Sequence, residues 1–329
     1  MKKTIAIVAG GDSSEHGVSL ESAKGLYSFM DHEKYNVYVI EFSGLTWEAI
    51  LADGTKVPVD RNDFSFIDHN KKVIPDFCYI TIHGQPGENG MLQGYFDLIR
   101  MPYSTSDVLV EAMTFDKFVL NNYLKGFGIH VADSVLLRHG ESFHEGEIIA
   151  RIGLPCFVKP AADGSSFGVS RVNTAEELAP AIKKANAEGG DVMVEGLLEG
   201  TEISCGIYKT SEKSVPLPIT EVVTEDEFFD YEAKYEGKVK EITPARLSPE
   251  TTEKVHEITS HIYDLLHAKG IIRVDYIISH KNGIDQVNML EVNTTPGMTA
   301  NSFIPQQVRA AGLDIKDVLS EIIEDILNK

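Results

Sequence analysis

Three oxygen-bearing side chains stand in two apolar runs, where their types and spacing suit a metal ion. Asp275 lies within the run 271–278, and Glu291 and Asn293 lie two residues apart at the end of the run 287–292. Side chains at such spacing point to one face of a strand. Carboxylate and amide oxygens are hard ligands of the kind that hold Mg²⁺ against phosphates. The alternative is a set of solvated side chains at strand ends, although an unpaired carboxylate inside an apolar strand is costly.

The turn signal Lys281-Asn282-Gly283 joins these two runs. Asn-Gly between apolar runs predicts a hairpin, and antiparallel pairing would let the three oxygen ligands converge. Arg273 lies two residues before Asp275 and faces the same side of the strand. It suits an oxyanion or phosphate contact, and a structural ion pair with Asp275 is the alternative.

A glycine- and serine-rich loop at 160–168 follows Lys159. Backbone N–H groups in such a loop can surround phosphate oxygens, with the lysine supplying charge. A hairpin loop that binds nothing is the alternative, because the Walker A ending is absent. The stretch 195–198 could hold an adenine edge, or it could be only a strand end and a turn. Lys117, taken singly, is more typical of a surface lysine.

Two further loops contain polar side chains where strands end. His83 follows the apolar run 77–82, and Glu15 stands on the loop after the first strand. Glu15 suits an ammonium group, whereas capping of the next helix is the competing interpretation. The aromatic and charged segment 228–237 has no strand or helix period, so it predicts a lid over a site, or else a loop that packs on its own domain.

The elements that position these side chains alternate between strands and helices. A strand, a glycine loop and a helix recur in the first hundred residues, which indicates a parallel α/β unit whose ligands gather at the carboxyl ends of the strands. We predict strands at 4–9, 36–42, 77–82, 131–137, 155–159, 169–172, 191–195, 202–209 and 215–223. We predict helices after residue 14, from 91, and at 114–125, 142–151, 175 onward, 249–268, 303–310 and 314–327. The segments 43–75 and 225–243 read as irregular.

Composition narrows the class of protein. The chain has 329 residues, 43% of them hydrophobic, and a formal net charge of −20. The absence of a long Lys/Arg cluster argues against nucleic acid or an anionic membrane as a partner. No run approaches the roughly twenty apolar residues of a membrane span. The three separated cysteines, each in an apolar run, predict buried free thiols and a reducing, cytoplasmic location.

Taken together, these pieces resemble the D-alanine–D-alanine ligases of the ATP-grasp superfamily. The resemblance covers almost the whole chain and rests on stretches in the family's order: GGDSSEHGVSLESA, HGQPGENG, FDK, LPCFVKPAADGSSFGVSRV, VEGLLEGTE, FDYEAKY, RVDY and LEVNTTPGMTANSF. It implies an α/β fold of three domains. A Rossmann-like parallel α/β domain (1–104) would hold the first substrate, and two α+β domains (105–197 and 198–329) would clamp ATP.

The resemblance also implies roles for residues. Glu15, Ser165 and Tyr235 would link through hydrogen bonds and close the lid, with Glu15 also binding the first substrate's ammonium group. Arg273 and the Gly297 amide would stabilise an oxyanion. The remaining implied contacts are ATP phosphates for Lys117, Lys159, Gly164, Ser166 and Lys234; adenine for Glu195 and Leu198; ribose for Glu202; two Mg²⁺ or Mn²⁺ ions for Asp275, Glu291 and Asn293; the first substrate for His83; and the second substrate's carboxylate for Ser302 and Phe303.

The implied reaction is ATP-dependent ligation of two D-alanine molecules through a D-alanyl phosphate, for peptidoglycan precursor synthesis by a homodimer. Two positions depart from frequent family patterns. Asn89 stands where Asp is frequent, which we expect to matter little in a turn. Gly196 stands where relatives often have Lys, which puts one purine contact in doubt.

Three rival functions remain open at the level of sequence. A related ligase could take D-lactate or D-serine as its second substrate, although the family associates the tyrosine of DYEAKY with dipeptide synthesis. A nucleotide-sensing protein would bind ATP without turnover and would tolerate loss of the metal ligands. A structural protein would leave the charged residues within the strands unexplained.

Overall fold

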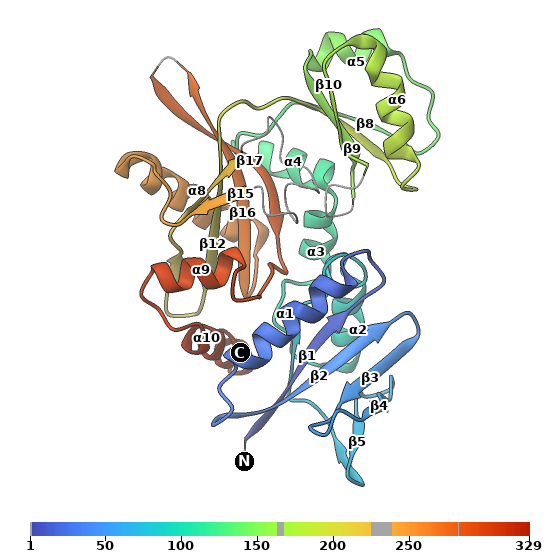
Figure 1. Cartoon of the computed structure of the whole chain (residues 1–329), viewed down its shortest axis with the longest axis vertical. Helices are drawn as coiled ribbons and strands as arrows, with labels where there is room; N and C mark the ends of the chain where they lie inside the picture. Colours follow the sequence, from blue (N-terminus) through green and yellow to red (C-terminus); the bar gives the residue numbers. More distant parts are fainter. Residues whose placement is uncertain (1, 163–167, 225–238, 282) are drawn as a thin grey trace.

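Three sheets organise the chain in the computed structural model, which describes residues 2–162, 168–224, 239–281 and 283–329. They follow one another along the sequence, and Figure 1 shows them as three bodies, with the second sheet (green) set apart from the other two. Cys78, Cys156 and Cys205 are free and buried, as predicted. No helix among the described residues is long and apolar enough to cross a membrane.

The first sheet has the order β4-β3-β2-β1-β7, and only β1, β2 and β7 run parallel. The parallel α/β prediction is therefore correct for the centre of this sheet. The segment predicted as irregular instead forms an antiparallel edge and a small separate hairpin, β5-β6. The elements are β1 (Lys3–Gly10), α1 (His16–Phe29), β2 (Tyr35–Ser43), β3 (Thr46–Ile50), β4 (Lys56–Pro58), β5 (Phe66–Asp68), β6 (Lys71–Val73), β7 (Phe77–Ile80) and α2 (Met91–Ile99).

The second sheet has the order β10-β9-β11-β8 and is antiparallel. Thr174 and Glu177 form a capping box at the start of α6, which satisfies two backbone N–H groups at the helix end. The elements are β8 (Ser134–Leu137), α5 (Glu145–Ile152), β9 (Cys156–Pro160), β10 (Ser170–Val172), α6 (Ala175–Asn186) and β11 (Val192–Gly196).

The third sheet has the order β15-β14-β12-β16-β17, and β13 pairs with β12. The predicted hairpin is β16-β17, which pairs antiparallel and is longer than predicted. Part of the segment predicted as irregular is a strand, β15, because it pairs with β14. The elements are β12 (Thr201–Lys209), β13 (Ser214–Pro216), β14 (Thr220–Thr224), β15 (Val239–Ile242), α8 (Pro249–Leu266), β16 (Ile271–Lys281), β17 (Ile284–Asn293), α9 (Phe303–Ala310) and α10 (Ile315–Leu327).

The helix predicted at 114–125 is two helices, α3 (Val108–Phe115) and α4 (Lys117–Lys125). Asp116 separates them, because its extended backbone ends α3 while its side chain accepts a hydrogen bond from the Val119 N–H and caps α4. Buried side chains of both helices belong to the core cluster of the third sheet. The three sheets lie within the three predicted domains, but this packing ties 108–125 to the third, and the boundaries stay a prediction.

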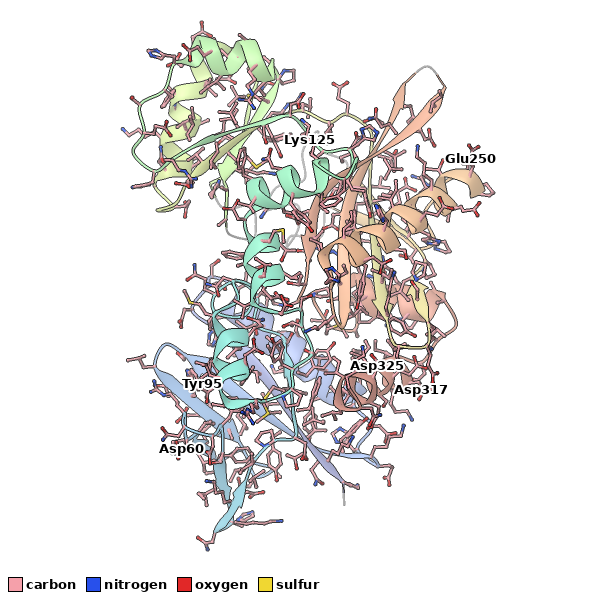
Figure 2. All side chains as sticks on the ribbon, turned by 180° about the vertical axis from the view of Figure 1, so that it is seen from behind. Asp60, Tyr95, Lys125, Glu250, Asp317 and Asp325 are labelled. Atoms are coloured by element: carbon pink, nitrogen blue, oxygen red, sulfur yellow. The ribbon has the colours of Figure 1, made fainter. Side chains whose placement is uncertain are left out.

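Exposed acidic side chains occur on separate parts of the molecule. Exposed Asp60, Glu250 and Asp317 lie near β4, at the start of α8 and in α10, respectively, and Figure 2 shows them well apart. The large negative charge therefore does not by itself mark a binding site.

Candidate active site

A cleft of about 920 Å³ is lined by residues of the second and third sheets, of α1 and of the loops that follow β1 and β7 of the first sheet. Every predicted site residue that the structure describes lines it: Glu15, His83, Lys117, Lys159, Glu195, Leu198, Glu202, Arg273, Asp275, Glu291, Asn293, Gly297, Ser302 and Phe303. Residues predicted from distant stretches of sequence therefore come together in one place.

The β16-β17 hairpin forms one end of this cleft. Asp275 pairs with Glu291 across the ladder, and Arg273 pairs with Asn293. The register then shifts between Asp275 and Tyr276, so that the ladder contains a bulge beside the paired carboxylates. Bulges re-aim side chains and are frequent next to active sites. Here the shift lies where two carboxylates face the same cleft.

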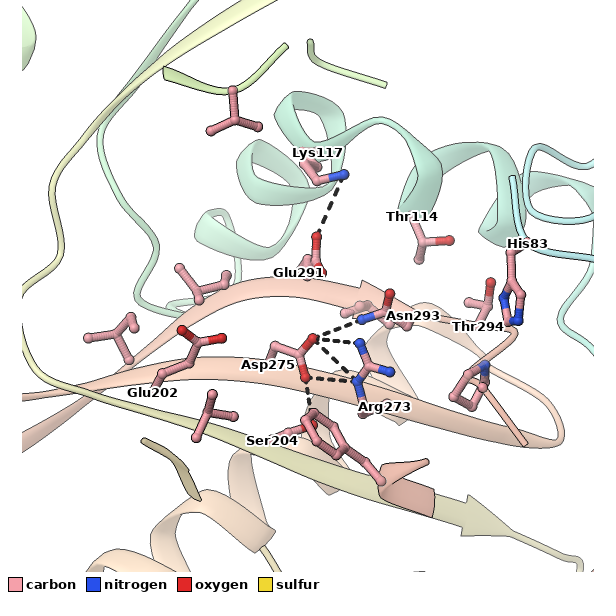
Figure 3. A pocket seen from close by; sticks show the side chains of 18 of the residues that line it. His83, Thr114, Lys117, Glu202, Ser204, Arg273, Asp275, Glu291, Asn293 and Thr294 are labelled. Carbon is pink, nitrogen blue, oxygen red and sulfur yellow. Dashed lines mark hydrogen bonds and ion pairs between the residues drawn. The ribbon is translucent and has the colours of Figure 1, made fainter. Parts of the chain in front are cut away.

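Asp275 is the centre of a hydrogen-bond network at this hairpin (Figure 3). Its carboxylate accepts from the Ser204 hydroxyl at 2.6 Å and from Asn293 Nδ2 at 3.0 Å. Arg273 donates to both carboxylate oxygens, with Nη2 2.9 Å from Oδ2 and Nε 3.0 Å from Oδ1. Such charge-assisted, bidentate contacts fix geometry as well as charge. Asp275 is therefore held in place by its neighbours on β12, β16 and β17.

Arg273 has two roles open to it in this arrangement. The ion pair with Asp275, which was the structural alternative, is present, and the same guanidinium lies 5.3 Å from the ring centre of Phe303 and lines the cleft. Burial works against its charge, but the carboxylates of Asp275, Glu291 and Glu88 together outweigh burial and raise the pKa of Arg273. A fixed cation thus faces the cleft.

The donor set of the hairpin fits a divalent cation that is also bound by phosphate. Within the described parts of the chain, no three His, Cys, Asp or Glu side chains form a metal cluster. The hairpin instead offers two carboxylates and one amide, from Asp275, Glu291 and Asn293. Mg²⁺ is usually held by one or two carboxylates together with substrate phosphates rather than by an all-protein cage.

The second sheet forms the opposite end of the cleft. Lys159 on β9 and Glu195 on β11 meet in an ion pair, with Nζ 2.5 Å from Oε1, and both side chains are largely buried. Lys117 opens α4, its N–H donates to the Ala161 carbonyl, and its Nζ lies 3.6 Å from Glu291. Its side chain is only 16% exposed, so the surface-lysine interpretation is wrong.

The two glycine loops of the first sheet meet at the third side of the cleft. The Ser13 hydroxyl donates to the His83 carbonyl, and the Asp12 N–H donates to the Gln85 carbonyl. Glu15 occupies the N-cap position of α1, yet within the described chain its side chain makes no capping hydrogen bond. The capping interpretation is therefore wrong, and the Glu15 carboxylate lines the cleft.

The start of α9 completes the lining. The Ser302 hydroxyl accepts from the Thr299 N–H at 3.1 Å and bonds the Thr299 hydroxyl at 2.8 Å. A Cβ at Gly297 would lie 3.0 Å from the Ser302 hydroxyl oxygen. Deeper in α9, Gln307 accepts from the Gly206 N–H and donates to the Ser204 carbonyl. The helix is thus tied to β12 behind the network of Asp275.

Comparison with known proteins decides the family. The profile described as "D-ala D-ala ligase N-terminus" matches residues 4–106, and "D-ala D-ala ligase C-terminus" matches residues 123–324. The chain belongs to the D-alanine–D-alanine ligase family. That membership confirms the predicted enzyme class, an ADP-forming ligase.

Relatives of this ligase family match over the full length. Two proteins named D-alanine--D-alanine ligase, from Phocaeicola vulgatus and Porphyromonas gingivalis, are 62% and 51% identical and are covered over 99% of their length, with 99% and 100% of this chain aligned. The solved VanG D-Ala:D-Ser ligase from Enterococcus faecalis has a TM-score of 0.85 at 28% identity, with 98% of this chain and 99% of that one covered. The solved D-alanine--D-alanine ligase from Bacillus anthracis complexed with ATP has a TM-score of 0.78 at 28% identity, with 99% of this chain and 98% of that one covered. The predicted ATP-grasp fold class is thereby confirmed.

Several predicted residues of this ligase lie outside the part of the chain that the structure describes. They are Gly164, Ser165 and Ser166 of the phosphate loop, and Lys234 and Tyr235 of the predicted lid at 228–237. Their roles stay predictions.

The sequence did not point to five polar side chains that line or support the cleft. Ser204 bonds Asp275, and Glu88 and Glu111 bond consecutive threonines, Thr295 and Thr294. Burial raises the pKa values of both glutamates. The quoted stretches HGQPGENG and LEVNTTPG contain Glu88 and both threonines, but nothing in the sequence links them to one another.

Proposed function

We propose that the chain joins two D-alanine molecules to D-alanyl-D-alanine, with conversion of ATP to ADP and phosphate, and thereby supplies a peptidoglycan precursor. The observation that carries the proposal is the convergence of Glu15, Arg273 and the paired carboxylates of the hairpin on one cleft in a chain that matches this ligase family from end to end.

The first step overcomes the poor electrophilicity of a carboxylate. A carboxylate oxygen of the first D-alanine attacks the γ-phosphorus of ATP, the bond from phosphorus to the bridging oxygen breaks, and ADP departs with its electron pair. Glu15 holds the ammonium group and His83 positions the substrate beside it. Lys117 and Lys159 neutralise phosphate charge, which is the protein's main task in phosphoryl transfer.

The second step forms the peptide bond. The amine of the second D-alanine attacks the acyl carbon and loses a proton, the carbon–oxygen bond to phosphate breaks, and phosphate departs. Arg273 and the Gly297 N–H stabilise the tetrahedral oxyanion, while Ser302 and Phe303 receive the second substrate's carboxylate. Glu195, Leu198 and Glu202 hold the nucleoside, and Gly164, Ser165, Ser166, Lys234 and Tyr235 belong to the segments that close over the reacting groups and exclude water.

We propose that Asp275, Glu291 and Asn293 hold two Mg²⁺ or Mn²⁺ ions. When bound, these ions neutralise charge on the transferred phosphoryl group. The Asp275 network supports this assignment, because Asn293 donates its Nδ2 to Asp275, and its amide oxygen is the atom that would bind a cation.

The experiment is phosphate release from Mg-ATP with D-alanine, L-alanine, D-alanine plus D-serine, and D-alanine plus D-lactate, with products identified by mass. We expect D-alanyl-D-alanine from D-alanine, no product from L-alanine, loss of turnover with EDTA and recovery with Mn²⁺. ATP binding without phosphate release would support a nucleotide sensor instead. A mixed dipeptide with D-serine or a depsipeptide would move the proposal to a related ligase.

We also propose a cytoplasmic homodimer. Exposed apolar side chains gather on the adjacent helices α2 and α3, where Met91, Leu98 and Leu109 are 65%, 85% and 71% exposed. Such a patch on a water-soluble surface commonly marks an interface. Sedimentation should give a dimer mass, and Leu98→Glu should give a monomer. A wild-type monomer at micromolar concentration would contradict this.

A further inference from the structure

Glu111 is a buried carboxyl group that the proposed reaction does not use. It lies on α3, its side chain is inaccessible to solvent, and its Oε2 bonds the Thr294 hydroxyl at 2.5 Å. Its Oε1 is buried and has no hydrogen-bond partner of good geometry among the described residues, although the nearby Ser106 backbone acts to lower the pKa of the carboxyl group. An incompletely paired buried carboxyl group costs free energy, so an apolar residue would serve the core of α3 better.

Thr294, the partner of Glu111, lies directly after the end of the β16-β17 hairpin. The β16-β17 ladder ends at the pair of Arg273 with Asn293, and Thr294 is the next residue. From there to Gly297 the ladder no longer holds the backbone. This short segment (residues 293–297) contains the proposed amide ligand at its beginning and the proposed oxyanion donor at its end.

Beyond the end of the ladder, side chains from other elements hold the backbone by hydrogen bonds. The Thr295 hydroxyl donates to Glu88 at 2.6 Å, and Glu88 also accepts from the Gly84 N–H at 2.7 Å. The Met298 N–H donates to the Ser22 hydroxyl of α1. Glu111 supplies the contact from α3. The segment and the residue that follows it, Met298, are therefore bonded to α1, to α3 and to the loop after β7.

We propose that Glu111 is a positioning residue, which fixes the 293–297 segment through Thr294 so that Asn293 and the Gly297 N–H keep the geometry that the reaction needs. This inference rests on the proposed function of the cleft. Burial raises the pKa of Glu111 well above that of an ordinary glutamate.

The test compares Glu111→Ala and Thr294→Val with the conservative Glu111→Gln, whose amide oxygen can still accept from Thr294. Thr251→Val is the matched control, because the Thr251 hydroxyl of α8 is as buried as that of Thr294 and donates to the Asp285 carboxylate at 2.5 Å, near the hairpin turn and away from the segment. Initial rates, KM for ATP and thermal unfolding are measured for each variant.

We expect Glu111→Ala and Thr294→Val each to lower kcat by about 10–100-fold, the scale of a small misplacement of reacting groups, with KM for ATP within about twofold. The double variant should be no worse than either single variant, because the two changes remove one contact. Glu111→Gln should retain kcat within about threefold. The control should be destabilised similarly and should keep its kcat.

A second readout does not depend on turnover. Amide hydrogen exchange across 293–298 should be faster in Glu111→Ala than in the wild type and in Glu111→Gln. Unchanged kcat and exchange in Glu111→Ala, or an equal loss of kcat in Thr251→Val, would overturn the proposal. If the wild type made no dipeptide, the proposed function would fail, whereas the exchange difference would still test the contact.

Discussion

The hairpin end and the second-sheet end of the cleft hold their charged side chains in different ways. At the hairpin, Asp275 is bonded by Ser204, Arg273 and Asn293, and the strands belong to a core shared with α3, α4 and α8. At the other end, Lys159 and Glu195 form an ion pair. Among the described residues, the second sheet packs into a core cluster of its own, built from residues 135–194.

This difference suggests that the two ends of the cleft have different tasks, one in holding reacting groups in place and the other in binding nucleotide. Groups that must meet the transition state are best fixed before substrate arrives, because reorganisation then costs little during the reaction. The Asp275 network has that property. In the proposed reaction, by contrast, the Lys159–Glu195 pair would share its lysine with an incoming phosphate, and it stands on a unit with a separate core. We infer that the hairpin end determines kcat and the second-sheet end determines affinity for nucleotide.

The largest predicted effect comes from Glu291→Gln at the hairpin end. Replacing a carboxylate by a neutral amide should lower kcat by about 10³-fold or more, because phosphoryl charge is no longer neutralised at this position. Thermal unfolding should remain close to that of the wild type. The measurement is phosphate release at saturating substrates, with exposed Glu253→Gln on α8 as a control that keeps full activity. Wild-type turnover in Glu291→Gln would refute the metal assignment.

A smaller and different effect is predicted for Glu195→Gln at the second-sheet end. The substitution removes the anion that holds Lys159, so KM for ATP should rise by about tenfold, with kcat falling only by a small factor. Steady-state kinetics with ATP varied at saturating D-alanine make the comparison. A fall in kcat as deep as that of Glu291→Gln, at unchanged KM, would erase the distinction between the two ends.

The smallest effects concern added methyl groups. Gly25 of α1 packs against the segment after the hairpin, and a Cβ there would lie 2.1 Å from the Met298 carbonyl oxygen. Gly25→Ala should therefore lower the free energy of unfolding by about 1–3 kcal/mol and reduce kcat severalfold. Gly146→Ala in α5 of the second-sheet unit, where a Cβ meets nothing within 4 Å, should instead stabilise by up to about 1 kcal/mol. Denaturant unfolding of both variants tests this, and the same sign for both would contradict it.

Local patterns in the sequence predicted much of the fold. The hairpin was predictable from two apolar runs and an Asn-Gly turn, and the capping box of α6 from Thr174 and Glu177. The short strands β3 to β6 and β15 were missed, because three to five residues give little periodicity and their pairing depends on distant partners. The break between α3 and α4 was missed because Asp116 interrupts an otherwise helical pattern by its cap alone.

The convergence of Asp275, Glu291 and Asn293 on one cleft was predictable, because chemistry and family resemblance coincided there. Glu111 was not, since it looks like an ordinary acid in a helix and its partner Thr294 is 183 residues away. Lys117 was underestimated for the same reason, because its burial depends on Glu291 and on the end of β9. Contacts over such separations follow from tertiary packing, which no single stretch of sequence contains.

The most direct test of the proposed mechanism follows an oxygen atom. D-Alanine labelled with ¹⁸O in its carboxylate is supplied with Mg-ATP, and the released phosphate is analysed by mass. Because the attacking carboxylate oxygen stays on phosphorus when the acyl–oxygen bond breaks, each phosphate should carry a single labelled oxygen for every dipeptide formed. Dipeptide accompanied by unlabelled phosphate would contradict the acyl-phosphate route through this cleft.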